Sequence, residues 1–321
     1  MGNLFILKKN ESSIADLLDG PAALMGVGNV YYAVKTGDTA VYNWLMQNRQ
    51  RKYKDGSYAV HAAAAGGTAI QAALDATVEC RNDYVIVMPS DSDYDLTAVL
   101  TLSKKAVHLI CPAGLGLERG ATNACRLHQN TAATAIFAVS DASVEIAGFY
   151  LKPYVDISHV TVAATSYGLN IHHNFFTLNW TSAPAEAILC AGDGGAWGQV
   201  SHHNVFQSMS GDDVTCASLI TIGASATGAR CDYNDIFLGD GNTLTVAINN
   251  AATKGSANYN TFMAAGSDAT FTHCIAIGSY GVAIGNRGCV GDGAIITGGV
   301  NNITNVDNMN AVDGGAIDDL D

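Results

Sequence analysis

Short apolar runs bounded by Gly, Asn or Asp recur from residue 84 to about residue 296. The runs at 84–88, 107–111 and 187–190 each have the length and composition of a β-strand. No helical pattern of twelve residues separates any two of them, so alternating β/α units are not expected. The pattern predicts an all-β fold over most of the chain.

A phrase repeats at a fixed spacing within this series. It reads YGLNIHHN at 167–174, WGQVSHHN at 197–204 and TGARCDYN at 227–234, and a shorter copy ends at residue 260. A period of this length is typical of stacked units that bury their apolar faces on one another. Each unit can hold two or three short strands with their turns, which is one coil of a parallel β-solenoid.

The Asn that ends each copy is predicted to lie above its counterpart in the next coil. Asn tolerates the left-handed backbone of a tight bend better than other non-glycine residues, and stacked amides can hydrogen-bond along a rod. A Phe two or three positions later should stack inward, and Phe149 suggests a weaker copy upstream. The predicted ladder consists of Asn174, Asn204, Asn234, Asn260, Phe176, Phe206, Phe237 and Phe262.

The chain is predicted to divide into three parts. Residues 1–66 form a small mixed segment, with a strand at 30–34 and a helix after residue 38, and are expected to anchor or oligomerise the protein. Residues 67–300 form the solenoid, with a helix at 68–80 that caps its N-terminal end. Its capping box pairs Thr68 with Gln71. The Asn- and Asp-rich residues 301–321 are a C-terminal cap or tail.

The residues around this helix carry a resemblance to a known family. The helix is followed by an apolar strand that ends at Pro89, then by the segments DYDLTAVLTL and VHLICPAG. This order resembles the start of right-handed parallel β-helix proteins of the pectin-lyase-like superfamily, which includes phage tailspikes and other virion β-helices. The resemblance covers about residues 67–300 and implies a fold rather than an activity.

The composition limits the classes of partner that the protein is expected to bind. The net charge is −13, which disfavours nucleic acids and anionic membranes. The eight Cys have no metal-ligand spacing and several lie in apolar runs, so buried reduced thiols and folding in a reducing host cytoplasm are expected. No cofactor and no metal site are predicted, although His172, His173, His202 and His203 admit either a stacked ladder or a shared metal ion.

Candidate chemistry is sparse. The resemblance implies an N-T-D, a G-D-D or Q-D-D, a G-H-G and an R-x-K element in polygalacturonase-like enzymes, and only Gly211-Asp212-Asp213 matches. A hydrolase would use Asp193 and Asp213 as acid and base, with His202 or His203 assisting. The alternative is that the paired aspartates belong to a turn.

These observations favour a structural virion surface protein of a bacteriophage, such as a head-decoration protein, a short tailspike or a fibre subunit. It is expected to form a homotrimer and to bind other virion proteins, with a host surface glycan as a further candidate partner. The alternative is a polysaccharide-cleaving depolymerase. The residues predicted to bind a partner are Trp44, Arg49, Arg51, Lys52 and Lys54, although these cations also suit a solvated helix end.

Overall fold

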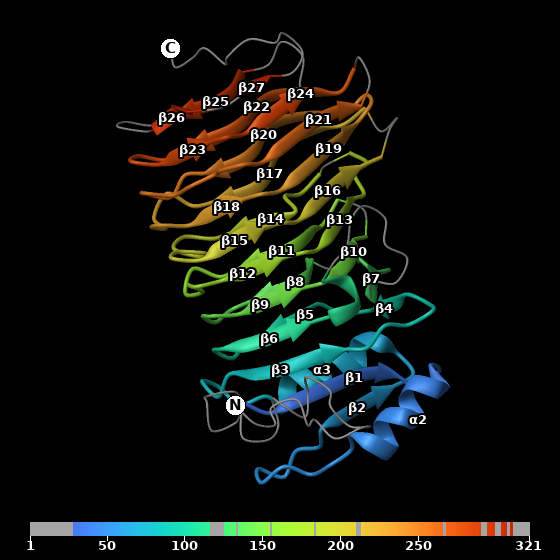
Figure 1. Cartoon of the computed structure of the whole chain (residues 1–321). Coiled ribbons are helices and arrows are strands. Elements are labelled where there is room, and N and C mark those ends of the chain that lie inside the picture. The colour runs from blue at the N-terminus through green and yellow to red at the C-terminus, as the bar shows by residue number, and fades with distance from the viewer. Residues whose placement is uncertain are drawn as a thin grey trace, which may run out of the picture.

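The chain folds as a parallel β-solenoid in which three sheets run along one rod. The computed structural model describes residues 28–115, 125–132, 134–154, 156–182, 184–209, 213–265, 268–289, 294–298, 303–306 and 309–310. Figure 1 shows the turns stacked along the long axis, from the N-terminal end in blue to the C-terminal end in red. In the described part of the chain, all named strand pairs are parallel and join one turn to the next.

From β3 to β20, each turn contributes one strand to each sheet in the order I, II, III. Sheet I contains, in hydrogen-bonded order, β18 (Arg230–Asp232), β15 (Gln199–His202), β12 (Asn170–His172), β9 (Glu145–Ala147), β6 (Val107–Ile110), β3 (Asp83–Val87), β1 (Val30–Lys35) and β2 (Val60–Ala63). Sheet II contains β27 (Met309–Asn310), β24 (Arg287–Cys289), β21 (Thr261–Ala265), β19 (Asp235–Gly239), β16 (Val205–Ser208), β13 (Phe175–Leu178), β10 (Phe149–Lys152), β7 (Cys125–Gln129) and β4 (Tyr94–Leu96). Sheet III contains β25 (Ala294–Gly298), β22 (Thr270–Ile277), β20 (Thr243–Asn250), β17 (Thr215–Ile222), β14 (Ile188–Cys190), β11 (Ser158–Val162), β8 (Ala135–Val139) and β5 (Leu100–Leu102). A separate pair joins β23 (Val282–Ile284) to β26 (Ile303–Val306).

The interior is one continuous apolar core built by side chains at alternate strand positions. Leu109, Ile146 and Ile171 occupy aligned positions on neighbouring strands of sheet I, and all three are fully buried. Since successive strand residues point to opposite faces, alternation alone directs one side chain inward and the next outward. Stacking then buries each turn's apolar face on its neighbours, which is why the repeat in the sequence produces a rod.

Two α-helices lie in the N-terminal part of the described chain. Helix α2 (Thr39–Asn48) follows β1, as the apolar spacing predicted, and buries Leu45. Helix α3 (Gly66–Ala76) begins and ends earlier than the predicted 68–80. The capping box predicted with Gln71 is wrong, because that amide instead donates to Asp75 Oδ1 at 2.8 Å and accepts from the Thr101 N–H at 2.9 Å.

Helix α3 packs its buried face against β1, β2, β4 and β5. A Cβ at Gly66 would meet the Tyr94 ring at 2.2 Å, so glycine permits this close approach. Sheet I nevertheless continues beyond β3 through β1 and β2, so the helix covers the core while the sheet extends past it. The cap proposed from sequence therefore remains a prediction, as does the anchoring role of residues 1–66.

The thiols lie mostly inside the rod. Among the described residues, six Cys side chains are buried and Cys80 is exposed. Burial raises the pKa of Cys190 and of Cys216 to about 12, so both thiols stay protonated at neutral pH. Neither α2 nor α3, nor any other described helix, is both long enough and apolar enough to cross a bilayer.

Candidate functional site

The bend between sheets I and II is built from the same two positions in successive turns. The first position holds His173, His203, Tyr233 and Tyr259, whose φ angles of 52° to 58° are left-handed. The second position holds the repeated Asn. The prediction that Asn itself takes the left-handed conformation is therefore wrong, because the residue before it does so and leaves the Asn side chain free to turn into the rod.

The buried amides of the repeated Asn form a ladder whose hydrogen bonds pair backbone groups at this bend. Asn204 Oδ1 accepts from the backbone N–H of Asn174 at 2.9 Å and from its Nδ2 at 3.1 Å. Asn234 donates in the same two ways to Asn260 Oδ1, both at 2.9 Å. Asn260 donates in turn to Asn286, which was not predicted from the repeat. The four predicted asparagines thus lie in one column, and the column continues by one turn.

The aromatic column beside this ladder departs from the prediction at one residue. Phe176 and Phe206 align and stack with ring centroids 4.4 Å apart. Phe206 then aligns with Ile236, and Ile236 aligns with Phe262. Phe237 lies one position later, so strand alternation turns it to the outer face of sheet II, and its placement in the inward column is wrong.

The predicted alignment of Phe149, in the weaker upstream copy of the repeat, with Phe176 is also wrong. The backbone N–H of Phe149 donates to Asn174 Oδ1 at 3.0 Å, so Phe149 occupies the first ladder position. Leu151, rather than Phe149, aligns with Phe176.

Outside the ladder, aromatic rings stack along the rod. His173 and His203 are 5.2 Å apart, His203 and Tyr233 are 5.0 Å apart, and Tyr233 and Tyr259 are 5.0 Å apart between ring centroids. His172 and His202 form a parallel second stack at 4.8 Å. Each of these rings therefore has at least one face covered by another ring of this chain.

A carboxylate organises the start of the second stack. Glu145 lies between His108 Nδ1, at 2.5 Å, and His172 Nε2, at 2.7 Å. Burial would raise the pKa of Glu145, but hydrogen bonds and charge from these two imidazoles lower it to about 2. Burial, with repulsion from His172, His203 and His173, lowers the pKa of His202 to about 4. Within the described residues, no group of three or more His, Cys, Asp or Glu side chains is arranged to hold a metal ion.

The three residues predicted for hydrolysis lie in three different places. Asp193 is in the bend from sheet III to sheet I, His202 is on sheet I, and Asp213 is in the bend from sheet II to sheet III. The strand β17 separates the two bends and spans roughly 23 Å at ~3.3 Å per residue. Glycosidase carboxylates stand ~5 to ~9.5 Å apart. The predicted pairing of Asp193 with Asp213 is therefore wrong, and residues 210–212 lie outside the described part of the chain.

The bend from sheet III to sheet I also has a left-handed residue at an aligned position in successive turns, but its side chains differ. Gly168 N–H donates to Ala196 O at 2.9 Å, and Trp197 N–H donates to Thr227 O at 2.8 Å. These bonds align Gly168, Trp197 and Gly228, with φ angles of 66°, 57° and 67°. A Cβ at Gly228 would lie 2.9 Å from the indole ring, so the Trp197 side chain lies over a glycine.

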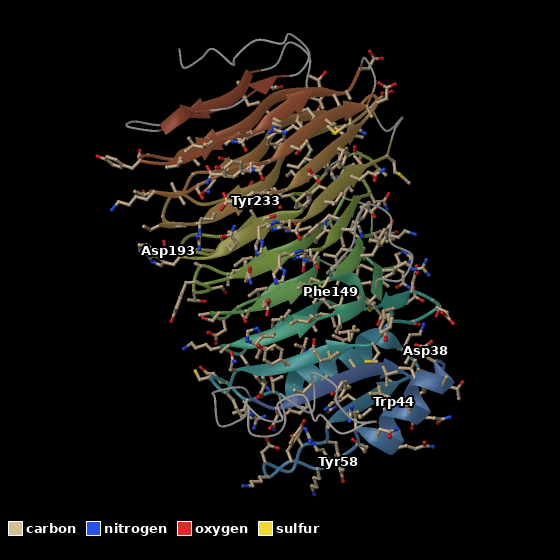
Figure 2. All side chains as sticks on the ribbon, viewed as in Figure 1. Asp38, Trp44, Tyr58, Phe149, Asp193 and Tyr233 are labelled. Carbon is tan, nitrogen blue, oxygen red and sulfur yellow. The ribbon has the colours of Figure 1, made fainter. Side chains whose placement is uncertain are left out.

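A groove opens beside Trp197. Its volume is about 790 Å³, and it is lined by Lys105, Ser140, Asp141, Ala164, Thr165, Tyr167, Asp193, Ala196 and Trp197. Trp197 is 68% exposed and Tyr167 is 52% exposed. Figure 2 shows Asp193 at the edge of the rod, with its side chain directed away from the sheets. Of these residues only Asp193 was predicted from the sequence, because Tyr167 and Trp197 coincide with the first position of the repeated phrase.

The predicted partner-binding residues lie at the N-terminal end of the rod. Trp44 is 47% exposed, and the Arg49 guanidinium lies 5.1 Å from the centre of its ring. Arg51 lies over Tyr53 at 5.0 Å and Lys52 over Tyr58 at 5.7 Å. Figure 2 places Trp44 on α2 and Tyr58 on the loop below it. Arg51, Lys52 and Lys54 also line a pocket of about 430 Å³.

Comparison of this chain with protein-family models, curated protein sequences and solved structures gives no match. The parallel β-solenoid is therefore established from the chain's own strand pairing and ladder.

Proposed function

We propose that this chain is a structural subunit of a bacteriophage particle, in the form of a short β-helical spike, fibre or head-decoration protein. The observation that carries the proposal is the column of buried Asn residues, in which the backbone N–H of each Asn donates to the amide oxygen of the next one from Asn174 to Asn286. The particle itself is suggested by the sequence resemblance, and the buried thiols are compatible with folding in a reducing cytoplasm.

Self-association is supported by the outer face of sheet II. Phe237 aligns with Met263 on the next strand, and both side chains point outward. One turn earlier Gln207 aligns with Phe237, and Val205, two positions before it on the same face, aligns with Phe175, whose ring stacks on Tyr150 with centroids 5.0 Å apart. Apolar residues on an outward sheet face are stabilised when a second copy covers them. We propose that this face is the homotrimer interface.

Docking on the particle is assigned to the N-terminal end. Lys52, Lys54 and Arg51 concentrate positive charge there in a chain whose net charge is −13. A complementary acidic surface on another virion protein would be attracted by this cluster.

Light scattering coupled to gel filtration tests self-association. The wild-type chain should elute at the mass of a trimer, and the double substitution Phe237→Ser with Met263→Ser should reduce it to a monomer. Thr245→Ser, on the exposed part of sheet III, is the matched control and should leave the trimer intact. A wild-type monomer at micromolar concentration would contradict the proposed interface. Mass spectrometry of purified particles tests the virion assignment, and absence of the chain from them would contradict it.

The depolymerase remains the second candidate because Asp141 and Asp193 line the same groove. Release of reducing sugar from host polysaccharide, lost in Asp193→Asn and in Asp141→Asn, would favour it over the structural role.

A further inference from the structure

Trp197 occupies an isolated position in its column of left-handed residues. In the I–II bend each ring has a ring above or below it, whereas Trp197 lies between Gly168 and Gly228. Because glycine has no side chain, neither neighbour can stack on the indole. The ring is consequently 68% exposed, which makes it the most exposed of the large apolar side chains among the described residues.

A β-bulge places Trp197 there. On β12, Asn170 aligns with Gln199 and His172 aligns with His202, so three steps of β15 face two steps of β12. The register shifts again between β15 and β18. The extra residue moves Trp197 into the left-handed position that Gly168 and Gly228 hold in the neighbouring turns. Bulges commonly re-aim a side chain near functional sites, and left-handed bulky residues cost free energy that the fold must offset.

The groove beside this ring runs along the rod. Its lining residues come from four consecutive III–I bends, from Lys105 to Trp197, which spans roughly 14 Å at ~4.8 Å per turn. Tyr167 supplies a second exposed ring one turn before Trp197. Two rings spaced along one open groove suit a linear ligand that offers flat apolar faces.

The polar lining indicates the chemistry of that ligand. Asp141 and Asp193 provide carboxylate oxygens, which accept hydrogen bonds from hydroxyl groups. The one cation among the lining residues, Lys105, interacts electrostatically with Asp141 and lies 3.5 Å from Glu79. Three carboxylates, those of Asp141, Asp193 and Glu79, therefore lie in or beside the groove with one ammonium group, and this net negative charge disfavours a polyanion.

We propose that this groove binds a neutral oligosaccharide lying parallel to the rod axis. The C–H faces of the sugar rings pack on Trp197 and Tyr167, and their hydroxyl groups donate to Asp141 and Asp193. This binding activity goes beyond the structural role proposed above and does not depend on it, because the groove is on a different edge of the rod from sheet II.

Calorimetric titration of the full chain with maltohexaose, cellohexaose and chitohexaose tests the proposal, with polygalacturonic acid as the acidic probe. At least one neutral probe should bind, and Trp197→Gly should weaken it at least tenfold because a stacked ring is lost. Glycine suits the φ of 57° at this position, so the variant should fold. Tyr167→Ala should weaken the same probe, and Trp44→Ala, which removes an exposed Trp outside the groove, should not.

Two outcomes would overturn the proposal. One is that none of the three neutral probes binds, or that polygalacturonic acid binds more tightly than all of them. The other is that Trp197→Gly and Tyr167→Ala retain wild-type affinity. The oligomeric mass of each variant, measured in parallel, separates failure of this site from failure of the proposed self-association.

Discussion

The two bends that flank sheet I share a backbone conformation and differ in what their side chains do. At the I–II bend, left-handed His and Tyr residues stack on one another, and the following Asn residues form a buried ladder. At the III–I bend, the left-handed positions include Ser143, Gly168, Trp197, Gly228 and Lys254, and a groove lies beside them.

The difference shows that one turn geometry can serve two purposes. Where the side chains satisfy each other, the bend stabilises the rod and leaves little for a ligand. Where glycines flank a lone aromatic ring, the same geometry exposes that ring. We expect substitutions in the first bend to change stability, and substitutions in the second to change binding.

The largest effect should come from the inward column beside the I–II bend. Phe206→Ala removes a fully buried ring stacked on Phe176 and should lower the free energy of unfolding by about 3–5 kcal/mol. Phe237→Ala is the matched control, and in the monomeric state it should cost no more than about 1 kcal/mol, because its side chain faces outward. Urea denaturation measures both, and equal losses would contradict the register described here.

The second largest loss of stability is expected for Asn204→Ala. The substitution removes the acceptor of the Asn174 backbone N–H and leaves Ile171 O without its donor at 2.9 Å inside the rod, whereas Asn174 Nδ2 keeps its bonds to Ile146 O and His172 O. Unmade buried hydrogen bonds of this kind cost about 1–3 kcal/mol each, so a total loss of roughly 2–4 kcal/mol is expected after relaxation. Asn249→Ala, on the partly exposed face of β20, should change the unfolding free energy by less than about 0.5 kcal/mol. Similar melting curves for the two variants would argue against the ladder's importance.

Acid should weaken the rod through the imidazole stacks. The pKa of His202 is about 4 in the folded chain and about 6.5 when unfolded, so the unfolded chain binds more protons between these values. The free energy of unfolding should therefore fall as the pH drops from 6.5 toward 4, by roughly 1 kcal/mol at pH 5 once solvent screening of this half-exposed group is included. Denaturation from pH 7.5 to 5 should show a shallower slope in His202→Gln, and an unchanged slope would be inconsistent with this cause.

The smallest effect contrasts the two bends directly. Trp197→Gly and Tyr233→Gly change residues whose φ angles are 57° and 58°. Relief of about 1 kcal/mol of backbone strain should outweigh the roughly 0.5 kcal/mol entropy cost of glycine in the first variant, which should be slightly stabilised. Tyr233→Gly also loses two stacked neighbours and should be destabilised by about 1 kcal/mol. Differential scanning calorimetry distinguishes them, and shifts of the same sign would remove the contrast.

Much of the fold could be predicted from the periodicity of the sequence, because a residue of the ladder must recur in every turn. Asn174, Asn204 and Asn234 follow one another at intervals of 30 residues, so their alignment could be predicted from the spacing alone. Asn286 was missed because Gly285 replaces the aromatic residue before it. Phe237 was misplaced because it follows its Asn by three residues instead of two, and strand alternation reverses the side chain's direction with each step.

The groove could not be predicted in the same way. The repeat aligns Trp197 with Tyr167 in sequence, whereas the bulge in β15 aligns Trp197 with Gly168 in space. A one-residue bulge has no distinctive composition, so its position emerges only from strand pairing. The pairing of Asp193 with Asp213 failed for a related reason, since residues twenty apart fall at different bends of one turn.

Hydrogen–deuterium exchange with and without a bound neutral oligosaccharide tests the division between the two bends most directly. We expect added protection of backbone amides at 164–168 and 193–198, with no change at 172–174 and 202–204. Protection at the His and Tyr stacks, or the same response at both bends, would contradict this division.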